Sequence, residues 1–387
     1  MKVNSAKVLP FVIGLTGAIG TGKSLVRKML EHHGALTIDA DQLAHCAYAK
    51  GTAGFQALII RFGNEILNET GHIDRKRVGV LVFKNPQALI ELEALIHPLV
   101  TQAVNRVIEL SPLPIIVIEA IKLLESDLKE HCDLVWVVAS PADEIYQRLK
   151  ETRGMNRAQV DERLNRQPIA KIGKNGVGAI IVNQGKMKDL WAAVSEKWED
   201  LSKNNKNFSI ALAKTRESMA PFQSTIIQPD DVTHAQAISE INKNGLLFLP
   251  VKNLASENPQ NIAEGFDPSC LEIPSFLYFL WSFEISSDNK IYLISDMDNF
   301  SASAAFSTGK NHSEEFSKII GMVEDFSRLH LCEKLFFPFN FKTGLLADKL
   351  GYTKFPSSSL QIADFSPLEY NLLCKQLRAP LNLFREN

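Results

Sequence analysis

The sequence predicts an α/β fold, in which a parallel sheet with crossover helices is followed by a second, α+β domain. From about residue 10 to about residue 200, short and nearly continuous apolar runs alternate with amphipathic stretches. This alternation is typical of strands buried on both faces and of the helices that cover them. The later part is richer in Phe, Asn and Ser. A length of 387 residues also exceeds one domain of about 150 residues.

Five apolar runs are the predicted strands of the first domain. They are residues 11–16, 35–39, 115–119, 134–139 and 179–183. Amphipathic patterns between them predict helices at residues 23–33, 86–110 and 141–150, the first followed by Gly34 at a C-cap position. The carboxyl ends of parallel strands border the ligand crevice of such sheets. Polar residues at those ends are therefore the first candidates for a site.

A polar stretch at residues 202–207 is expected to be the interdomain linker. Strand-like runs follow at residues 276–285 and 290–295, with a helical pattern near residues 314–331. The resulting boundaries are 1–203 for the first domain, 204–224 for the linker region and 225–387 for the second domain.

Charge and cysteine content exclude several classes of function. The 42 Lys and Arg residues nearly balance 44 Asp and Glu, so the chain has no overall footprint for nucleic acid or an anionic membrane. The five cysteines are odd in number and include no C-x-x-C pair, which argues against disulfides and zinc. No run approaches a membrane span, and the apolar run at residues 8–15 lacks a signal-peptide cleavage site. We expect a cytoplasmic protein without nucleic-acid or membrane partners.

A phosphate-binding motif, G-x-x-x-x-G-K-[ST], lies between the first predicted strand and the first predicted helix. Its glycines let the backbone close on phosphate, Lys23 reaches the β- and γ-oxygens, and Ser24 is a ligand for Mg²⁺. The N-terminus of the following helix adds a favourable dipole. We expect ATP and Mg²⁺ as cofactors; the alternative is a structural Gly-rich turn. The predicted nucleotide loop comprises Gly17, Ala18, Ile19, Gly20, Thr21, Gly22, Lys23, Ser24 and Leu25.

Three acidic residues follow predicted strands. A carboxylate there can accept a proton from a substrate hydroxyl or hold a metal-bound water. We interpret Asp41 as the base, and Asp39 as its helper or as the cap of a helix at residues 42–50. Glu119 is either a second-sphere contact for Mg²⁺ or a solvated acid at a strand end, and the sequence favours neither.

Arginines cluster after the fourth predicted strand, where a mobile lid over the nucleotide would lie. Guanidinium groups on a closing lid stabilise the charge of a phosphoryl group in transfer. The alternative is ordinary surface charge, since acidic residues lie among them, and we favour it for Arg157 and Arg166. The full cluster is Arg148, Arg153, Arg157, Arg163 and Arg166.

An ordered string of motifs resembles the dephospho-CoA kinase family. The motifs are residues 14–24 (GLTGAIGTGKS), 38–41 (IDAD), 61–63 (RFG), 73–75 (IDR), 82–83 (VF), 92–98 (LEALIHP), 118–125 (IEAIKLLE), 133–138 (DLVWVV) and 163–167 (RLNRQ). The resemblance implies a nucleoside-monophosphate-kinase-like fold with lid and helical substrate-binding insertions. It also implies ATP-dependent phosphorylation of the ribose 3′-hydroxyl of dephospho-CoA to CoA, the last step of coenzyme A biosynthesis.

The resemblance further implies residue roles. Lys23 falls on the ATP loop, Asp41 on the family's proposed base and Arg153 on its lid arginine, and we expect these three to be catalytic. Independently of the resemblance, we expect Arg148 of the arginine cluster to bind the nucleotide. Thr16 falls on the ATP loop, and His97 falls in the substrate-side helical region. The full set that we expect on the substrate side is Thr16, Asp39, Asp41, His97, Glu119 and Arg163. For His97, a packed or turn-forming role is the alternative. The chain departs from the family where Val177-Gly178 replaces the usual Ala-Asp, and where residues 121–124 (IKLL) replace the usual Pro-Leu-Leu.

Beyond the kinase-like region, residues 226–231 and 334–352 resemble the opening and closing parts of an N-acetyltransferase-like (GNAT) domain. Residues 307–313 (STGKNHS) do not form the glycine-rich turn that an acyl-CoA pyrophosphate needs. We therefore expect a degenerate, non-catalytic domain. Two alternatives to the kinase function remain: a nucleotide-binding regulatory module without turnover, and another small-molecule kinase. The sequence also leaves open a homo-oligomer.

Overall fold

The computed structural model describes residues 10–165, 177–219, 224–226, 281–286, 289–296, 301–308, 313–338, 350–355, 372–379, 381 and 383–384. Several sequence-based expectations lie outside these residues. They concern Arg166, the last part of the motif at 163–167, the start of the run at 276–285, most of the segment at 226–231 and most of the segment at 334–352.

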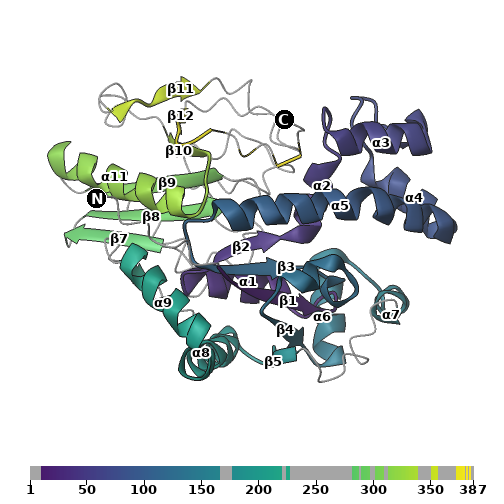
Figure 1. Ribbon diagram of the computed structural model, residues 1–387, viewed down its shortest axis with the longest axis horizontal. Coiled ribbons are helices and arrows are strands. Elements are labelled where there is room, and N and C mark those ends of the chain that lie inside the picture. Colours follow the sequence, from purple (N-terminus) through teal and green to yellow (C-terminus); the bar gives the residue numbers. More distant parts are fainter. Residues whose placement is uncertain are drawn as a thin grey trace, which may run out of the picture.

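A five-stranded parallel sheet forms the first part of the chain, in the order β2-β3-β1-β4-β5 (Figure 1). This sheet confirms the predicted α/β fold class. Its strands are β1 (Phe11–Gly17), β2 (Leu36–Asp39), β3 (Ile115–Glu119), β4 (Leu134–Ala139) and β5 (Val177–Val182). In the register, Glu119 pairs with both Leu15 and Asp39. The carboxyl ends of β1, β2 and β3 therefore meet at one edge.

Helices cover both faces of this sheet, and apolar side chains fill two clusters beneath them. One cluster joins the sheet to α1 (Lys23–His32), α8 (Met187–Asn204) and α9 (Lys206–Met219). The other joins it to α2 (Ala40–Ala47), α3 (Ala53–Phe62) and α5 (Pro86–Leu110). The remaining elements here are η1 (Asn64–Ile66), α4 (Arg75–Lys84), η2 (Leu123–Glu125), η3 (Asp127–His131), α6 (Ala142–Arg153) and α7 (Arg157–Asn165).

The stretch predicted to be a linker is helical, which corrects the sequence analysis. Helices α8 and α9 are separated only at Asn205. Phe208 of α9 is fully buried, with its ring 5.2 Å from that of Phe11 and 4.9 Å from that of Trp198. Residues 202–207 are polar because they lie at two helix ends, and the apolar side chain that holds α9 on the sheet comes just after them.

The C-terminal part contains a seven-stranded mixed sheet in the order β11-β12-β10-β9-β8-β7-β6. Strands β9 and β10 are parallel, with α11 (Ser313–Leu329) between them in the sequence. The strands are β6 (Ser224–Ile226), β7 (Trp281–Ser286), β8 (Asn289–Asp296), β9 (Ser301–Thr308), β10 (Lys334–Pro338), β11 (Thr353–Phe355) and β12 (Leu372–Gln376). The mixed sheet and α11 fit the expected α+β domain, whose acetyltransferase-like identity stays a prediction.

The two parts share a core. Phe326, at the end of α11, and Leu335 of β10 belong to the same buried cluster as Val104 and Val107 of α5. Figure 1 shows α11 beside the end of α5 that leads into β3. His330, just after α11, is completely buried, and burial lowers its pKa to about 4, with smaller effects from Glu31 and Lys28 of α1. The C-terminal part therefore packs directly on the parallel-sheet unit. Among the described residues, no helix is long and apolar enough to cross a membrane.

Candidate active site

The loop between β1 and α1 has the conformation that a phosphate cradle needs. Gly20 and Gly22 have φ angles of 78° and 90°, which disfavour other residues. A Cβ atom at Gly22 would lie 2.3 Å from the side-chain nitrogen of Asn183. Helix α1 begins after Gly22 without a side-chain cap. Backbone N–H groups of its first turn can therefore face an anion.

Hydrogen bonds within the loop hold its shape. The carbonyl oxygen of Ala18 accepts from the Thr21 hydroxyl (2.8 Å) and from Lys23 Nζ (3.1 Å). The Lys23 side chain is only 7% exposed. Burial lowers the pKa of Lys23, while the carboxylates of Glu119, Asp41 and Asp39 act in the opposite direction. Lys23 thus lies folded over its own loop, close to three acids.

Side chains from other elements brace the loop from outside. Asn183 Nδ2, just after β5, donates to the Thr21 carbonyl (2.8 Å). Arg148 of α6 donates to the Gly20 carbonyl (3.2 Å) and to the Asn183 carbonyl (3.3 Å), and it pairs with Glu144. The sequence analysis missed Asn183, although a polar residue ending a predicted strand was the available signal. Arg148, expected to bind nucleotide, contacts the loop backbone.

Apolar contacts connect the loop to the lid segment. Ile19 packs in a small buried cluster with Ile145 and Leu149 of α6 and Val160 of α7. Leu25, in the first turn of α1, is half-buried against the sheet cluster. These two members of the predicted nucleotide loop therefore anchor it through their side chains.

Asp39 and Asp41 occupy different environments. The Asp39 carboxylate accepts from the backbone N–H of Gln42 (3.0 Å) and so caps α2, which confirms the capping interpretation. Asp41 is solvent-accessible, and its carboxylate accepts from the backbone N–H of Ile121 (3.4 Å). Partial desolvation raises the pKa of Asp41, and the Lys23 charge opposes this. Asp41 is therefore the more accessible acid beside Lys23.

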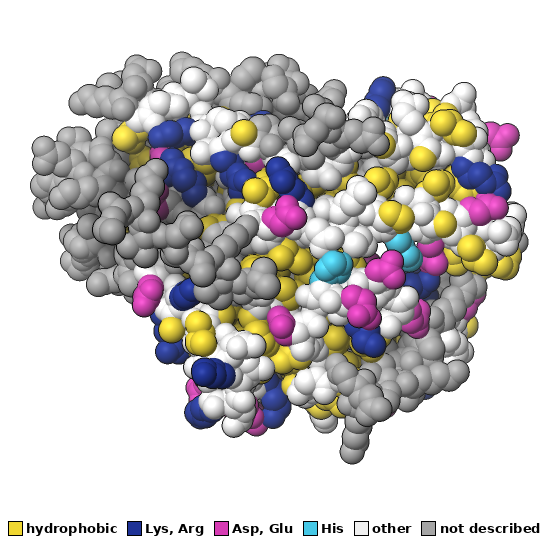
Figure 2. Space-filling view, in the orientation of Figure 1, with side chains coloured by type: hydrophobic (Ala, Val, Ile, Leu, Met, Phe, Trp, Pro, Cys, Tyr) yellow, Lys and Arg dark blue, Asp and Glu magenta, His cyan; other side chains and the backbone are white. Residues whose placement is uncertain are grey.

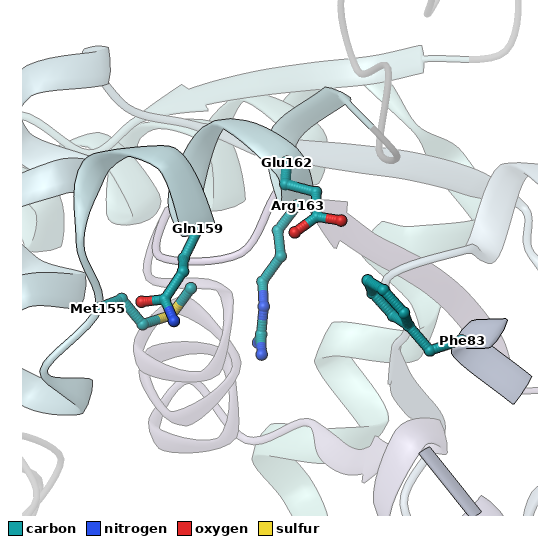
Figure 3. Close-up of a pocket in the computed structure, with 5 residues that line it drawn as sticks. All are labelled: Phe83, Met155, Gln159, Glu162 and Arg163. Carbon is teal, nitrogen blue, oxygen red and sulfur yellow. The ribbon is translucent and has the colours of Figure 1, made fainter. Parts of the chain in front are cut away.

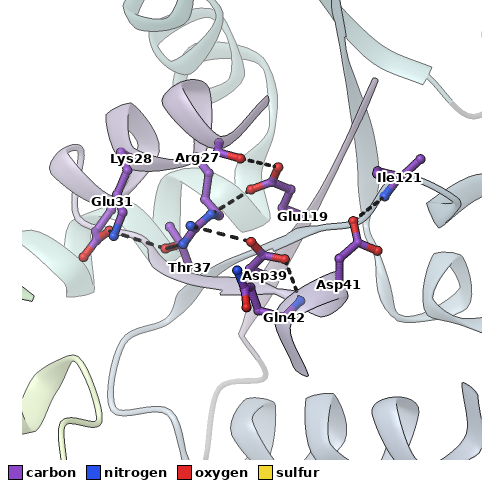
Figure 4. Close-up of polar contacts among 10 residues, drawn as sticks. Arg27, Lys28, Glu31, Thr37, Asp39, Asp41, Gln42, Glu119 and Ile121 are labelled. Atoms are coloured by element: carbon purple, nitrogen blue, oxygen red, sulfur yellow. Dashed lines mark hydrogen bonds and ion pairs between the residues drawn. The ribbon is translucent and has the colours of Figure 1, made fainter. Parts of the chain in front are cut away.

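Glu119 is buried beneath the loop, with 4% of its surface exposed. Its two carboxylate oxygens accept from the Ser24 hydroxyl (3.0 Å) and from Arg27 Nε (2.8 Å). Figure 4 shows Arg27 beside Glu119. The interpretation of Glu119 as a solvated acid at a strand end is therefore wrong. The sequence analysis did not single out Arg27. The available signal was a cation on the sheet-facing side of an amphipathic helix.

The lid arginines differ in their contacts. Arg153, at the end of α6, is exposed, yet its charge contributes to lowering the pKa of Lys23. Arg157 stacks over the Tyr146 ring at 4.5 Å, and the Tyr146 hydroxyl donates to Asp161. Arg157, which we interpreted as a surface charge, therefore contacts a side chain of α6 and so connects α6 to α7. Arg163 projects into a pocket between α7 and α4.

That pocket has a volume of about 370 Å³ (Figure 3). Its lining combines apolar and polar side chains: Phe83, Met155, Gln159, Glu162 and Arg163. Figure 2 shows further hydrophobic side chains on the surface over α3, α4 and the start of α5. Those that are more than half exposed are Ile60, Val80, Phe83 and Ile90.

Two expected substrate-side residues lie in unlike positions. Thr16 is 2% exposed, and its hydroxyl donates to the carbonyl of Ile121 (3.0 Å). His97 is exposed in the middle of α5, one residue before Pro98. The alternative of a packed or turn-forming His97 is therefore wrong. Gly178 lies at a register shift between β4 and β5, where a Cβ atom would be 3.1 Å from the Leu134 side chain.

The site suits a cation carried by a nucleotide. Within the described residues, no group of three or more His, Cys, Asp or Glu side chains could hold a metal ion alone. Mg²⁺ in nucleotide sites takes few protein ligands, because phosphates and water supply the others. The Ser24 hydroxyl, with Glu119 behind it, fits that requirement.

A parallel sheet, a glycine-rich loop leading into α1, and acids at the same edge define a kinase of the phosphate-loop class. The dephospho-CoA kinase family profile matches residues 11–189. A dephospho-CoA kinase from Frankia casuarinae is 39% identical over 49% of this chain and 83% of the relative. One from Thermobifida fusca is 36% identical over 49% of this chain and 96% of the relative. The chain belongs to the dephospho-CoA kinase family.

Solved structures match about 50% of the chain. The crystal structure of TT1252 from Thermus thermophilus is 29% identical, covers 50% of this chain and 98% of its own, and superposes with a TM-score of 0.45. Dephospho-CoA kinase from Campylobacter jejuni is 22% identical, covers 50% of this chain and 98% of its own, and has a TM-score of 0.39.

Proposed function

We propose that this chain transfers the γ-phosphoryl group of ATP to the ribose 3′-hydroxyl of dephospho-CoA, giving CoA and ADP. The reaction is the last step of coenzyme A biosynthesis. The observation that carries this proposal is the meeting of the phosphate loop, Lys23 and Asp41 at one sheet edge, in a chain of this family.

The phosphate loop is proposed to hold the ATP phosphates. Backbone N–H groups at the start of α1 face the β- and γ-phosphates, and Lys23 exchanges its contact with Ala18 for phosphate oxygens. Mg²⁺, with Ser24 as its protein ligand, supplies charge neutralisation on those phosphates when bound. Arg148 and Asn183 keep the loop in its cradle conformation. Asp39 and Glu119 support the same edge from beneath.

Asp41 is the proposed general base. A ribose hydroxyl is a weak nucleophile, and a carboxylate within hydrogen-bond reach orients and deprotonates it. The raised pKa of Asp41 brings it closer to the working pH, which strengthens it as a base. The Asp39 carboxylate caps α2, so Asp39 is proposed to help at this sheet edge and not to act as the base.

The acceptor is proposed to lie between the lid and the α3–α5 region. The mixed lining of the pocket at Arg163 and Phe83 suits a ligand with both polar and apolar parts. His97 and Thr16 complete the proposed substrate side. Arg153 is proposed to close over the transferred phosphoryl group, since its charge already acts on Lys23.

The test is release of ADP on addition of dephospho-CoA to the full chain with ATP and Mg²⁺. CoA, whose 3′-position is already phosphorylated, is the matched control acceptor. We expect ADP release with dephospho-CoA as the acceptor and none with CoA. The variant Lys23→Ala should lose most of this ADP release. ATP binding without release would favour a regulatory module. Release with a different hydroxyl acceptor only would favour another small-molecule kinase.

The C-terminal part is proposed to be a degenerate, non-catalytic N-acetyltransferase-like domain. Its support is the mixed sheet with α11 between the parallel strands β9 and β10. The lack of a glycine-rich turn in the sequence at residues 307–313 argues against acyl-CoA turnover. We also propose that the protein is cytoplasmic and has no nucleic-acid or membrane partners. A homo-oligomer is one assembly state that this proposal includes.

A further inference from the structure

Arg27 is buried beneath the phosphate loop, with 3% of its surface exposed. Its Nε donates to Glu119 (2.8 Å), its Nη1 donates to Thr37 (3.3 Å), and its Nη2 lies 3.9 Å from the Asp39 carboxylate. Figure 4 shows the guanidinium between these side chains. A buried cation is costly unless it is paired. The carboxylates of Glu119 and Asp39 offset this cost, and through them Arg27 connects α1 to the ends of β3 and β2.

The two oxygens of Glu119 have different partners. Oε2 accepts from Arg27, whereas Oε1 accepts from the Ser24 hydroxyl (3.0 Å). A serine hydroxyl has one proton, so donating it to Glu119 leaves the oxygen lone pairs for another partner. This is the state that a hydroxyl needs to become a metal ligand, and groups behind metal ligands orient them in this way.

The charge of Glu119 also acts on Lys23. Of the charges acting on Lys23, that of Glu119 has the largest effect on its pKa. If Arg27 were absent, Glu119 would lose a charged partner at 2.8 Å. Its carboxylate could then turn toward Lys23, away from Ser24. Arg27 thereby keeps the Glu119 carboxylate on the Ser24 hydroxyl and leaves Lys23 available for phosphate.

We propose that Arg27 is a positioning residue, which orients Glu119 and through it the Ser24 hydroxyl for the Mg²⁺ of the bound nucleotide. The inference deepens the proposed function and rests on it in one respect, the use of a Mg²⁺-nucleotide. It does not depend on which acceptor is phosphorylated.

The test measures ADP binding to the full chain by calorimetry, with and without Mg²⁺, so that no turnover is needed. In Arg27→Gln we expect the gain in ADP affinity due to Mg²⁺ to fall about 10-fold, with Mg²⁺-free ADP binding unchanged. Lys28→Gln is the matched control. It places the same side chain one position along α1, where the Lys28 amine pairs with Glu31 (3.1 Å). It should behave as wild type.

Arg27→Lys covers the case in which Arg27→Gln does not fold. Lysine keeps the charge but lacks the planar fork that contacts Glu119 and Thr37 together, so a smaller loss of Mg²⁺-dependent affinity is expected. Wild-type Mg²⁺ dependence in folded Arg27→Gln would overturn the inference, as would wild-type dependence in Arg27→Lys if that is the only folded variant. A chain that binds Mg²⁺-ADP but does not phosphorylate dephospho-CoA would overturn the proposed function alone.

Discussion

Asp39 and Asp41, which are separated by one residue, have different contacts at the sheet edge. Asp39 caps α2, whereas Asp41 remains accessible and close enough to Lys23 for each to affect the pKa of the other. The difference arises from the local backbone, because a residue at an N-cap directs its carboxylate at the N–H groups of the next turn. The residue after Ala40 lies inside the helix and directs its side chain elsewhere.

Asp41→Asn should lower kcat by about 10²-fold or more and leave ATP affinity nearly unchanged, because the amide cannot accept the proton of the ribose hydroxyl. Steady-state kinetics and ATP titration measure the two effects. Asp39→Asn is the matched control, since asparagine caps a helix as well as aspartate does. Equal losses of kcat in both variants would contradict the assignment of Asp41 as the base.

At the residue scale, the sequence indicated the site members that contact phosphate but missed those that support them. The motif pointed to Lys23 and Ser24, because their spacing follows from phosphate chemistry. Arg27 and Asn183 act through contacts with residues far away in the sequence, at Glu119 and Thr21. Such contacts depend on the strand order, which no local pattern encodes.

At the element scale, α6 connects the nucleotide loop to the lid. Arg148 bonds to the Gly20 carbonyl and to the Asn183 carbonyl after β5, while Ile145 and Leu149 of the same helix pack against Ile19. The loop is therefore held by one helix and the end of one strand. Movement of α6 would be transmitted to the phosphate site.

Arg148→Gln should raise the KM for ATP about 10-fold, since loss of charge-assisted hydrogen bonds costs about 1.5 kcal/mol or more. The effect on kcat should be smaller, because Arg148 contacts the loop backbone and not the acceptor. Lys150→Gln, an exposed cation on the same helix, is the control. A large fall in kcat at unchanged KM would instead indicate direct contact with the transferred phosphoryl group.

Elements were the most predictable level of the structure. The run at residues 115–119 and the helix at residues 86–110 agree with β3 and α5 at both ends. Strong apolar periodicity and an N-terminal Pro86 explain this success. The linker prediction failed because polar residues at helix ends resemble a loop, and only the burial of Phe208 distinguishes them.

At the scale of the whole molecule, the chain is not a kinase with a loosely attached tail. Phe326, Leu335 and Val107 share one buried cluster, and His330 is buried within reach of the charges of α1. The sequence did not predict this contact, because each helix already had an apolar face and nothing in the pattern says which faces meet.

Truncation after Met219 should lower the stability of the kinase part by several kcal/mol, because it exposes the α5 side chains that the C-terminal part covers. Truncation after residue 203 should lower the stability further, since it also removes α9 and Phe208 from the sheet. Thermal unfolding of both truncations beside the full chain measures the effect. Unchanged Tm and kcat after truncation at Met219 would mean that the kinase part is autonomous.

Identification of the phosphorylated product tests the central claim most directly. The full chain is incubated with dephospho-CoA, Mg²⁺ and ATP, and the product is examined by phosphorus NMR for coupling of the new phosphate to the ribose 3′-proton. The account predicts one new phosphomonoester at the 3′-position, formed in equal amount with ADP. Phosphate at another hydroxyl, or no product from a chain that binds Mg²⁺-ATP, would contradict it.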